Sequence, residues 1–133
     1  TKPVTGVAMM MLFEEGLFGS GAILTAVAGR ILDDLAAALR SDSDALVITV
    51  TGHTDDVPVP ARGRFTDNFS LGLARATTVA ERLRKAADLH ADALVLRSLG
   101  SGEPPFPNDS REGRLRNRTV VIRVGPHSGT ETR

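Results

Sequence analysis

The chain has 133 residues, of which 41% are hydrophobic and 24% are charged, and its formal net charge is zero. These values are ordinary for one compact globular domain and exclude the fibrous and disordered classes. Without a net positive charge, binding to duplex nucleic acid through bulk electrostatics is disfavoured, so we expect no nucleic-acid partner. The chain contains no cysteine, which excludes disulfides, thiol catalysis and Cys-based metal sites.

The ends of the sequence suggest a domain taken from a larger protein. The chain begins at Thr1 and shows neither a signal peptide nor an apolar run of about 20 residues that could span a membrane. We therefore expect membrane attachment through a segment that lies outside this sequence. The chain 1–133 is expected to form a single domain, with a core of about residues 4–125 and a flexible polar tail over 126–133.

The first part of the chain predicts a strand, a helix and a second strand. Val4 to Phe13 is apolar enough for a strand, and a glycine-rich loop follows it. Thr25 can cap a helix that begins near Ala26, and apolar residues then recur at helical spacing as far as Leu39. The β-branched run from Leu46 to Thr51 predicts a central strand that is buried on both faces.

The second part begins with a long irregular segment, residues 53–67, which contains two prolines and a glycine. Long ordered loops of this kind are often functional. An amphipathic helix is expected from Asn68 or Ser70 to Leu89. The remaining expected elements are a strand over Leu94 to Leu99, a loop over Gly100 to Gly113, a short helical turn over Arg114 to Asn117 and a strand over Thr119 to Val124.

This order of elements predicts an α/β fold, in the form of an α+β sandwich with the order βαβαβ(α)β. A mixed four-stranded sheet with the helices packed on it is expected. In such sheets, ligands bind in the crevice beyond the carboxyl ends of strands. Asp55 follows one such strand end, and Arg75 lies in the first turns of the next helix. A carboxylate can bind an ammonium and a guanidinium can fork onto a carboxylate, so one pocket holding both would suit a ligand with an amine and an acid on one carbon.

The residues alone also allow interpretations in which Asp55 and Arg75 bind no ligand. Asp55 could cap the loop, and Arg75 could be solvated or paired with Asp55. A metal site could be formed by His53, Asp55 and Asp56, with His90 or His127 as a further ligand. Because His90 ends a helix and His127 lies in the tail, the two are not expected to converge on one site, and we expect no metal and no cofactor. We expect His53 to fix the turn between strand and loop by hydrogen bonds. We also expect no enzyme, since adjacent acids in an extended segment point to opposite faces and no serine lies on a nucleophile elbow.

Four motifs follow one another along the chain. They are Leu17-Phe18-Gly19-Ser20-Gly21-Ala22, Gly52-His53-Thr54-Asp55, Asn68-x-x-Leu71-x-x-x-Arg75-Ala76 and Glu112-Gly113-Arg114-x-Arg116-Asn117-Arg118-x-Val120. In identity and order, from about Phe13 to Val124, they resemble the OmpA-like peptidoglycan-binding domains. This family includes outer-membrane proteins, peptidoglycan-associated lipoproteins, flagellar stators of the MotB type and type VI secretion anchors. The loop from Asp56 to Phe65 is similar to the longer insertion of the stator and secretion members.

The resemblance implies a non-catalytic periplasmic domain of a Gram-negative cell, which binds peptidoglycan and anchors a membrane, secretion or motor complex to the cell wall. The ligand would be the meso-diaminopimelate of the peptide stem, with its ammonium on Asp55 and its carboxylate on Arg75. The other residues implied are Thr54, Asn68 and Leu71, which would shape the pocket, and Arg118, which would support its wall or touch the carboxylate.

Three positions depart from the family pattern. Gly72 stands where Ser is usual, Phe69 where stator-like members often have Trp, and Thr119 replaces the second Arg of the last motif. Loss of a hydroxyl, an N–H donor and a cation near the ligand would weaken binding. An alternative function is therefore a structural module for homodimerisation in a secretion or motor complex, with weak or no peptidoglycan binding. A metal-dependent hydrolase would need a metal at His53 and Asp55.

Overall fold

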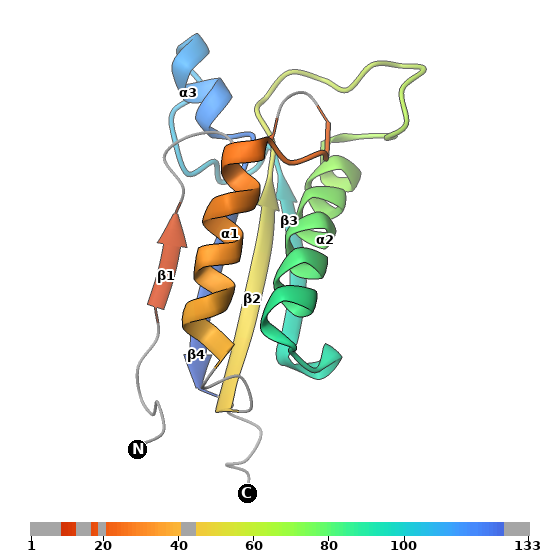
Figure 1. Cartoon of the computed structure of the whole chain (residues 1–133). Helices are drawn as coiled ribbons and strands as arrows, with labels where there is room; N and C mark the ends of the chain where they lie inside the picture. The colour runs from red at the N-terminus through yellow and green to blue at the C-terminus, as the bar shows by residue number, and fades with distance from the viewer. Residues whose placement is uncertain (1–8, 13–16, 19–20, 41–44, 127–133) are drawn as a thin grey trace, which may run out of the picture.

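The structure is a computed structural model, which describes residues 9–12, 17–18, 21–40 and 45–126. In this part of the chain β1 (Met9–Leu12), β2 (Leu46–His53), β3 (Leu94–Gly100) and β4 (Val120–Pro126) form one four-stranded sheet in the order β1-β4-β2-β3 (Figure 1). β2 is parallel to β3 and antiparallel to β4, which is in turn antiparallel to β1. The sheet is mixed, as the sequence predicts.

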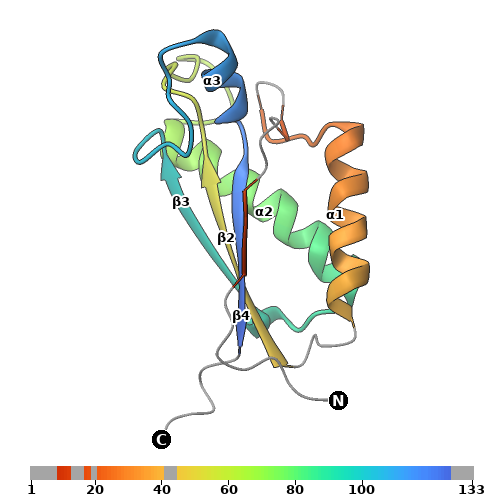
Figure 2. The same cartoon turned by 90° about the vertical axis from the view of Figure 1, so that its left-hand side faces the viewer.

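Two helices, α1 (Ala26–Leu39) and α2 (Asn68–Ala87), cover one face of the sheet, as Figure 2 shows. The short helix α3 (Arg111–Arg116) lies beyond the end of the sheet at which β2 and β3 finish, and a 3₁₀ turn, η2 (Ala91–Ala93), leads into β3. The fold is thus a mixed α+β fold with helices packed on a sheet, which confirms the predicted class.

Capping side chains fix the starts of α1 and α2 where the sequence predicts them. Thr25 accepts a hydrogen bond from the backbone N–H of Ala28 at 3.2 Å and caps α1, and Asp67 accepts one from the N–H of Ser70 at 2.8 Å and caps α2. At the other end of α2, Asp88 takes the left-handed conformation with φ of 56°. That conformation ends α2 short of the predicted Leu89.

The core lies between the helices and the sheet. Its largest fully buried apolar side chains come from the helices, the sheet and the segment before α1, and are Phe18, Leu32, Ile48, Val50, Val79, Leu83, Val120 and Ile122. Full burial of one such apolar side chain contributes about 1.5–3 kcal/mol. The packing of α2 on β2 and β3 brings the start of α2 close to the carboxyl ends of both strands, and that end of the sheet carries the site described below.

Several boundaries differ from the prediction. β2 is central, but Val47 and Thr49 are only half-buried, so the expectation of burial on both faces is wrong. The reason is that α1 and α2 cover the same face. The short helix begins at Arg111, where Ser110 caps it, rather than at Arg114. Pro126 belongs to β4, where it pairs with Leu46, and not to a tail. Most of the predicted strand over residues 4–13 and the tail over 127–133 lie outside the described residues.

Candidate ligand-binding site

β2 and α2 approach each other unusually closely where the site forms. A Cβ added to Gly52 would lie 1.7 Å from the carbonyl oxygen of Gly72, a distance that no real Cβ tolerates. Only glycine at position 52 therefore permits this approach of strand and helix. As a result Asp55, just after β2, and Arg75, in α2, reach the same region at the end of the sheet.

Arg75 is held rigidly, and its side chain is almost completely buried, with 1% of the residue exposed. Its Nε donates to the carbonyl oxygen of Gly21 at 2.8 Å, and its Nη1 donates to that of His53 at 3.0 Å. Its guanidinium carbon lies 5.2 Å from the centroid of the Phe18 ring, a cation–π contact. The first, second and third motifs thus meet at one guanidinium.

Burial lowers the pKa of Arg75 to about 10, an effect that nearby Asp55 opposes and nearby Arg118 reinforces. The group stays protonated at neutral pH, so the protein carries a cation in a place where solvation is poor. A positive charge in such a place favours the approach of an anion.

Asp55 is 8% exposed, and each of its two carboxylate oxygens accepts a hydrogen bond. Its Oδ1 accepts from the backbone N–H of Val57 at 3.1 Å, and its Oδ2 accepts from Nε of Arg118 at 3.0 Å. The side chain of Arg118 is 32% exposed. Asp56 is exposed, so the two neighbouring acids diverge as the extended geometry predicts. The cation that pairs with Asp55 is therefore Arg118, from the fourth motif.

A cavity of about 210 Å³ opens between these charges. Its walls are formed by Asp55, Val57, Pro58, Val59, Pro60, Asn68, Leu71, Arg75 and Arg118. Five of the six residues singled out from the sequence thus surround one space. Asn68 donates from Nδ2 to the carbonyl oxygen of Val57 at 3.2 Å and so ties the start of α2 to the loop. Its Oδ1 is buried and accepts no hydrogen bond within the described part of the chain.

Thr54, the sixth residue singled out, does not line the cavity. It is completely buried, and its Oγ1 donates to the carbonyl oxygen of Asp55 at 2.8 Å. Its backbone N–H donates to the carbonyl oxygen of Gly100 at 2.9 Å. Thr54 therefore shapes the turn that presents Asp55 and makes no part of the pocket wall.

Asn117 is a positioning residue that the sequence reasoning missed. It is fully buried, and its Nδ2 donates to the carbonyl oxygen of Phe106 and to Oδ1 of Asn108, both at 2.8 Å. Its Oδ1 accepts from the N–H of Phe106 at 2.9 Å. These bonds join the loop before α3 to the residue directly before Arg118. The available signal was its place inside the fourth motif.

His53 contributes through its backbone rather than through its ring. Its N–H donates to the carbonyl oxygen of Thr119 at 2.9 Å and its own carbonyl accepts from Arg75, whereas the buried ring nitrogen Nδ1 makes no hydrogen bond among the described residues. The hydrogen bonds of His53 at the end of β2 are thus made by its backbone.

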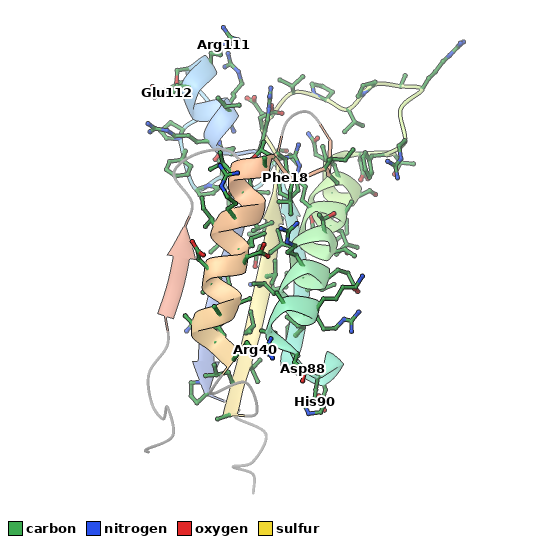
Figure 3. The ribbon with its side chains drawn as sticks, viewed as in Figure 1. Phe18, Arg40, Asp88, His90, Arg111 and Glu112 are labelled. Carbon is green, nitrogen blue, oxygen red and sulfur yellow. The ribbon has the colours of Figure 1, made fainter. Side chains whose placement is uncertain are left out.

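The histidines and acids do not converge on a metal site in the described residues. Figure 3 shows His90 near Asp88 at the end of the molecule opposite to Phe18, over which Arg75 lies. His90 is therefore too remote to join His53 and Asp55. The other histidine considered, His127, lies outside the described residues.

The three departures from the family pattern lie away from the cavity. Gly72 faces Ser98 and Gly52, Phe69 is exposed on α2, and Thr119 is fully buried. Neither they nor their neighbours Ser98 and Gly52 line the cavity. The three substitutions therefore do not change the lining of this cavity.

The OmpA family model matches residues 17–118, which begins at the first motif and ends at Arg118. The chain belongs to the OmpA family. It is 31% identical over 85 residues to Motility protein B of Bacillus subtilis, an alignment that covers 64% of this chain and 32% of that protein. The chain spans less than a third of the length of the curated relatives it matches.

Two solved structures are similar to this chain in fold. The cell wall anchor of the type VI secretion system from Pseudomonas aeruginosa is 30% identical, with a TM-score of 0.73 over 90% of this chain and 81% of that one. The periplasmic domain of Helicobacter pylori MotB shares the fold at 24% identity, with a TM-score of 0.74 over 90% of this chain and 75% of that one. No helix among the described residues is long and apolar enough to cross a membrane.

Proposed function

We propose that this domain binds peptidoglycan through the meso-diaminopimelate of its peptide stem and anchors a membrane-attached complex to the cell wall of a Gram-negative cell. The observation that carries the proposal is the cavity in which one buried carboxylate, Asp55, meets two guanidiniums, Arg75 and Arg118. The relationship to a type VI secretion cell wall anchor and to motility proteins supports it. We propose a periplasmic location and attachment through a segment outside this sequence on the same grounds.

The geometry suggests that the ligand replaces an existing ion pair. Nε of Arg118 donates to one carboxylate oxygen of Asp55, and the backbone N–H of Val57 donates to the other. An ammonium entering the cavity would take the place of Arg118 on Oδ2. The displaced guanidinium would then bind the carboxylate on the same carbon of the ligand, together with the positive charge of Arg75.

This exchange predicts a modest affinity. Charge-assisted hydrogen bonds contribute about 1.5–3 kcal/mol each. Part of that gain is offset, because the Asp55–Arg118 bond is lost and the ligand and the loop are immobilised. We expect a Kd of about micromolar to millimolar order for one stem peptide. Several such domains in one complex, each bound to a different stem peptide of the same polymer, would raise the effective affinity through avidity.

The test combines calorimetric titration of free meso-diaminopimelate with a pull-down on insoluble peptidoglycan. Asp55→Asn keeps the shape of the side chain and removes its charge, so we expect a loss of about ten-fold or more in affinity. Arg118→Gln should lose a similar amount. Asp33→Asn is a matched control, because Asp33 pairs with Arg82 at 2.8 Å on the exposed surface and does not line the cavity. Asp55→Asn binding as tightly as the wild type would refute the site.

A second function, self-association in a larger complex, is favoured by one observation. β3 is an edge strand, and the apolar side chains of Val95 and Leu96 on it and of Phe69 and Leu73 on α2 are exposed. Exposed apolar side chains beside a free strand edge favour pairing with another chain. Sedimentation of the isolated domain tests this proposal: a concentration-dependent dimer that Leu96→Lys abolishes supports it, and a monomer at all concentrations contradicts it.

A further inference from the structure

A second cavity, of about 390 Å³, adjoins the first. It is lined by Gly21, Ala22, Ile23, Pro60, Gly63, Arg64 and Phe65. Pro60 forms part of the wall of both cavities. A volume of this order is within the range of small-molecule sites. The two cavities are therefore adjacent, and residues of the long loop 53–67 line both of them.

Hydrogen bonds fix both sides of this second cavity. On one side the carbonyl oxygens of Gly21 and Ala22 accept from Nε of Arg75 at 2.8 Å and from Oγ1 of Thr78 at 2.9 Å. On the other side the loop closes on itself, because the N–H of Gly63 donates to the carbonyl oxygen of Pro60 at 3.0 Å. The cavity is thus a built feature of the fold. Arg75 also links the two compartments, since it lines the first and holds a wall of the second.

The chemistry of the second cavity differs from that of the first. Its lining is apolar, from Ile23, Pro60 and the ring of Phe65, and it holds a single cation. The guanidinium carbon of Arg64 lies 5.6 Å from the centroid of the Phe65 ring, which places the charge beside the apolar surface. A short apolar side chain followed directly by a carboxylate matches this combination.

We propose that the second cavity binds the residue that follows diaminopimelate in the stem peptide, a D-alanine, with its methyl group against Phe65 and its carboxylate on Arg64. This inference rests on the proposed function, because the zwitterionic end of diaminopimelate must occupy the first cavity. The methylene chain of diaminopimelate then leads past Pro60, the shared wall, to the peptide-bonded end. The domain therefore reads two consecutive residues of the stem.

The test measures binding of three probes by calorimetry: free meso-diaminopimelate, the tripeptide L-Ala–γ-D-Glu–meso-diaminopimelate and the tetrapeptide that adds D-Ala. The variants are Arg64→Gln and Phe65→Ala. Their matched controls are Arg62→Gln, an exposed cation of the same loop, and Phe106→Ala, a half-buried phenylalanine of the loop before α3, neither of which lines either cavity. Circular dichroism confirms that each variant is folded.

The wild type should bind the tetrapeptide more tightly than the tripeptide. Each of the two variants should weaken tetrapeptide binding by about three- to fivefold, erase its advantage over the tripeptide and leave free diaminopimelate unaffected. The controls should behave as the wild type. Unchanged tetrapeptide binding in both variants would overturn this inference and leave the proposed function standing. A wild type that binds none of the three probes would overturn both.

Discussion

Gly72→Ala tests the close packing of α2 on the sheet that positions the site. An added Cβ would lie 2.4 Å from Oγ of Ser98 and 3.1 Å from the carbonyl oxygen of Gly52. Ser98 cannot simply turn away, because its Oγ donates to the carbonyl oxygen of Phe69 at 2.7 Å and accepts from the N–H of Gly100 at 3.2 Å. The hydroxyl of Ser98 is thus the main obstacle to a side chain at position 72.

The magnitude follows from two opposing effects. Alanine is a better helix former than glycine and should stabilise α2 by about 0.8–1 kcal/mol. The clash with Ser98 should cost about 1–3 kcal/mol, through strain or through loss of the hydroxyl's hydrogen bonds. We expect Gly72→Ala to destabilise the wild type by about 0–2 kcal/mol. In a Ser98→Ala background, where the obstacle is gone, the same change should be neutral or stabilising by up to about 1 kcal/mol.

Urea unfolding followed by far-ultraviolet circular dichroism measures the four corners of this double-mutant cycle, and the slope with urea should stay constant. Gly21→Ala is the control, because a Cβ added there meets nothing within 4 Å. Its effect should add to that of Ser98→Ala within about 0.5 kcal/mol. Equal effects of Gly72→Ala in both backgrounds would refute the reasoning and move the obstacle to the Gly52 carbonyl.

Three further predictions concern stability. Gly52→Ala should cost about 3 kcal/mol or more in unfolding free energy, because the added Cβ meets the backbone of Gly72 at 1.7 Å and no side chain can move aside; urea midpoints check this, and a near-native midpoint contradicts it. Asn117→Ala should cost about 2–4 kcal/mol by the same assay, since it leaves the buried N–H and carbonyl of Phe106 without their partner, and a loss under about 1 kcal/mol would contradict that role. Burial lowers the pKa of His53, so the unfolded chain binds the proton more readily, and stability should fall as pH drops through the ordinary histidine range near about 6.5. The wild type should therefore unfold at a lower urea concentration at about pH 5.5 than at about pH 7.5, and His53→Gln should make this difference between the two midpoints smaller; an unchanged difference would contradict the role of His53 in the pH dependence.

The secondary structure was largely predictable because its signals are local. The cap at Thr25, the apolar stripe of α2 and the β-branched run of β2 each involve neighbours within a few residues, and α1 and α2 begin where the sequence predicts. The errors arose at positions whose burial depends on which other layer of the fold packs against them. The half-buried Val47 and Thr49 reflect the absence of a helix on the second face of the sheet among the described residues, which no local pattern encodes.

The site was predictable in its membership but not in its pairing. Motif resemblance brought Asp55, Arg75, Asn68, Leu71 and Arg118 together, and these residues share one cavity. The bond from Arg118 to Asp55 joins positions 63 residues apart, so only the folded chain reveals it. In the same way Thr54, which the resemblance implies as a residue that shapes the pocket, is buried, and its hydroxyl bonds to the backbone carbonyl of Asp55.

The two arginines have different physical roles, and this difference bears on selectivity. Arg75 is buried and tied to two backbone carbonyls, so it supplies a fixed charge. Arg118 is partly exposed, and in the proposed function it is the partner of Asp55 that the ligand displaces. A ligand with a carboxylate alone would have to draw Arg118 away and leave the buried Asp55 uncompensated, at a cost of several kcal/mol. A ligand with an ammonium alone would leave two guanidiniums without a new anion. In the proposed function, a ligand with both charges on one carbon satisfies all three groups at once, so the ion pair between Asp55 and Arg118 selects for zwitterions.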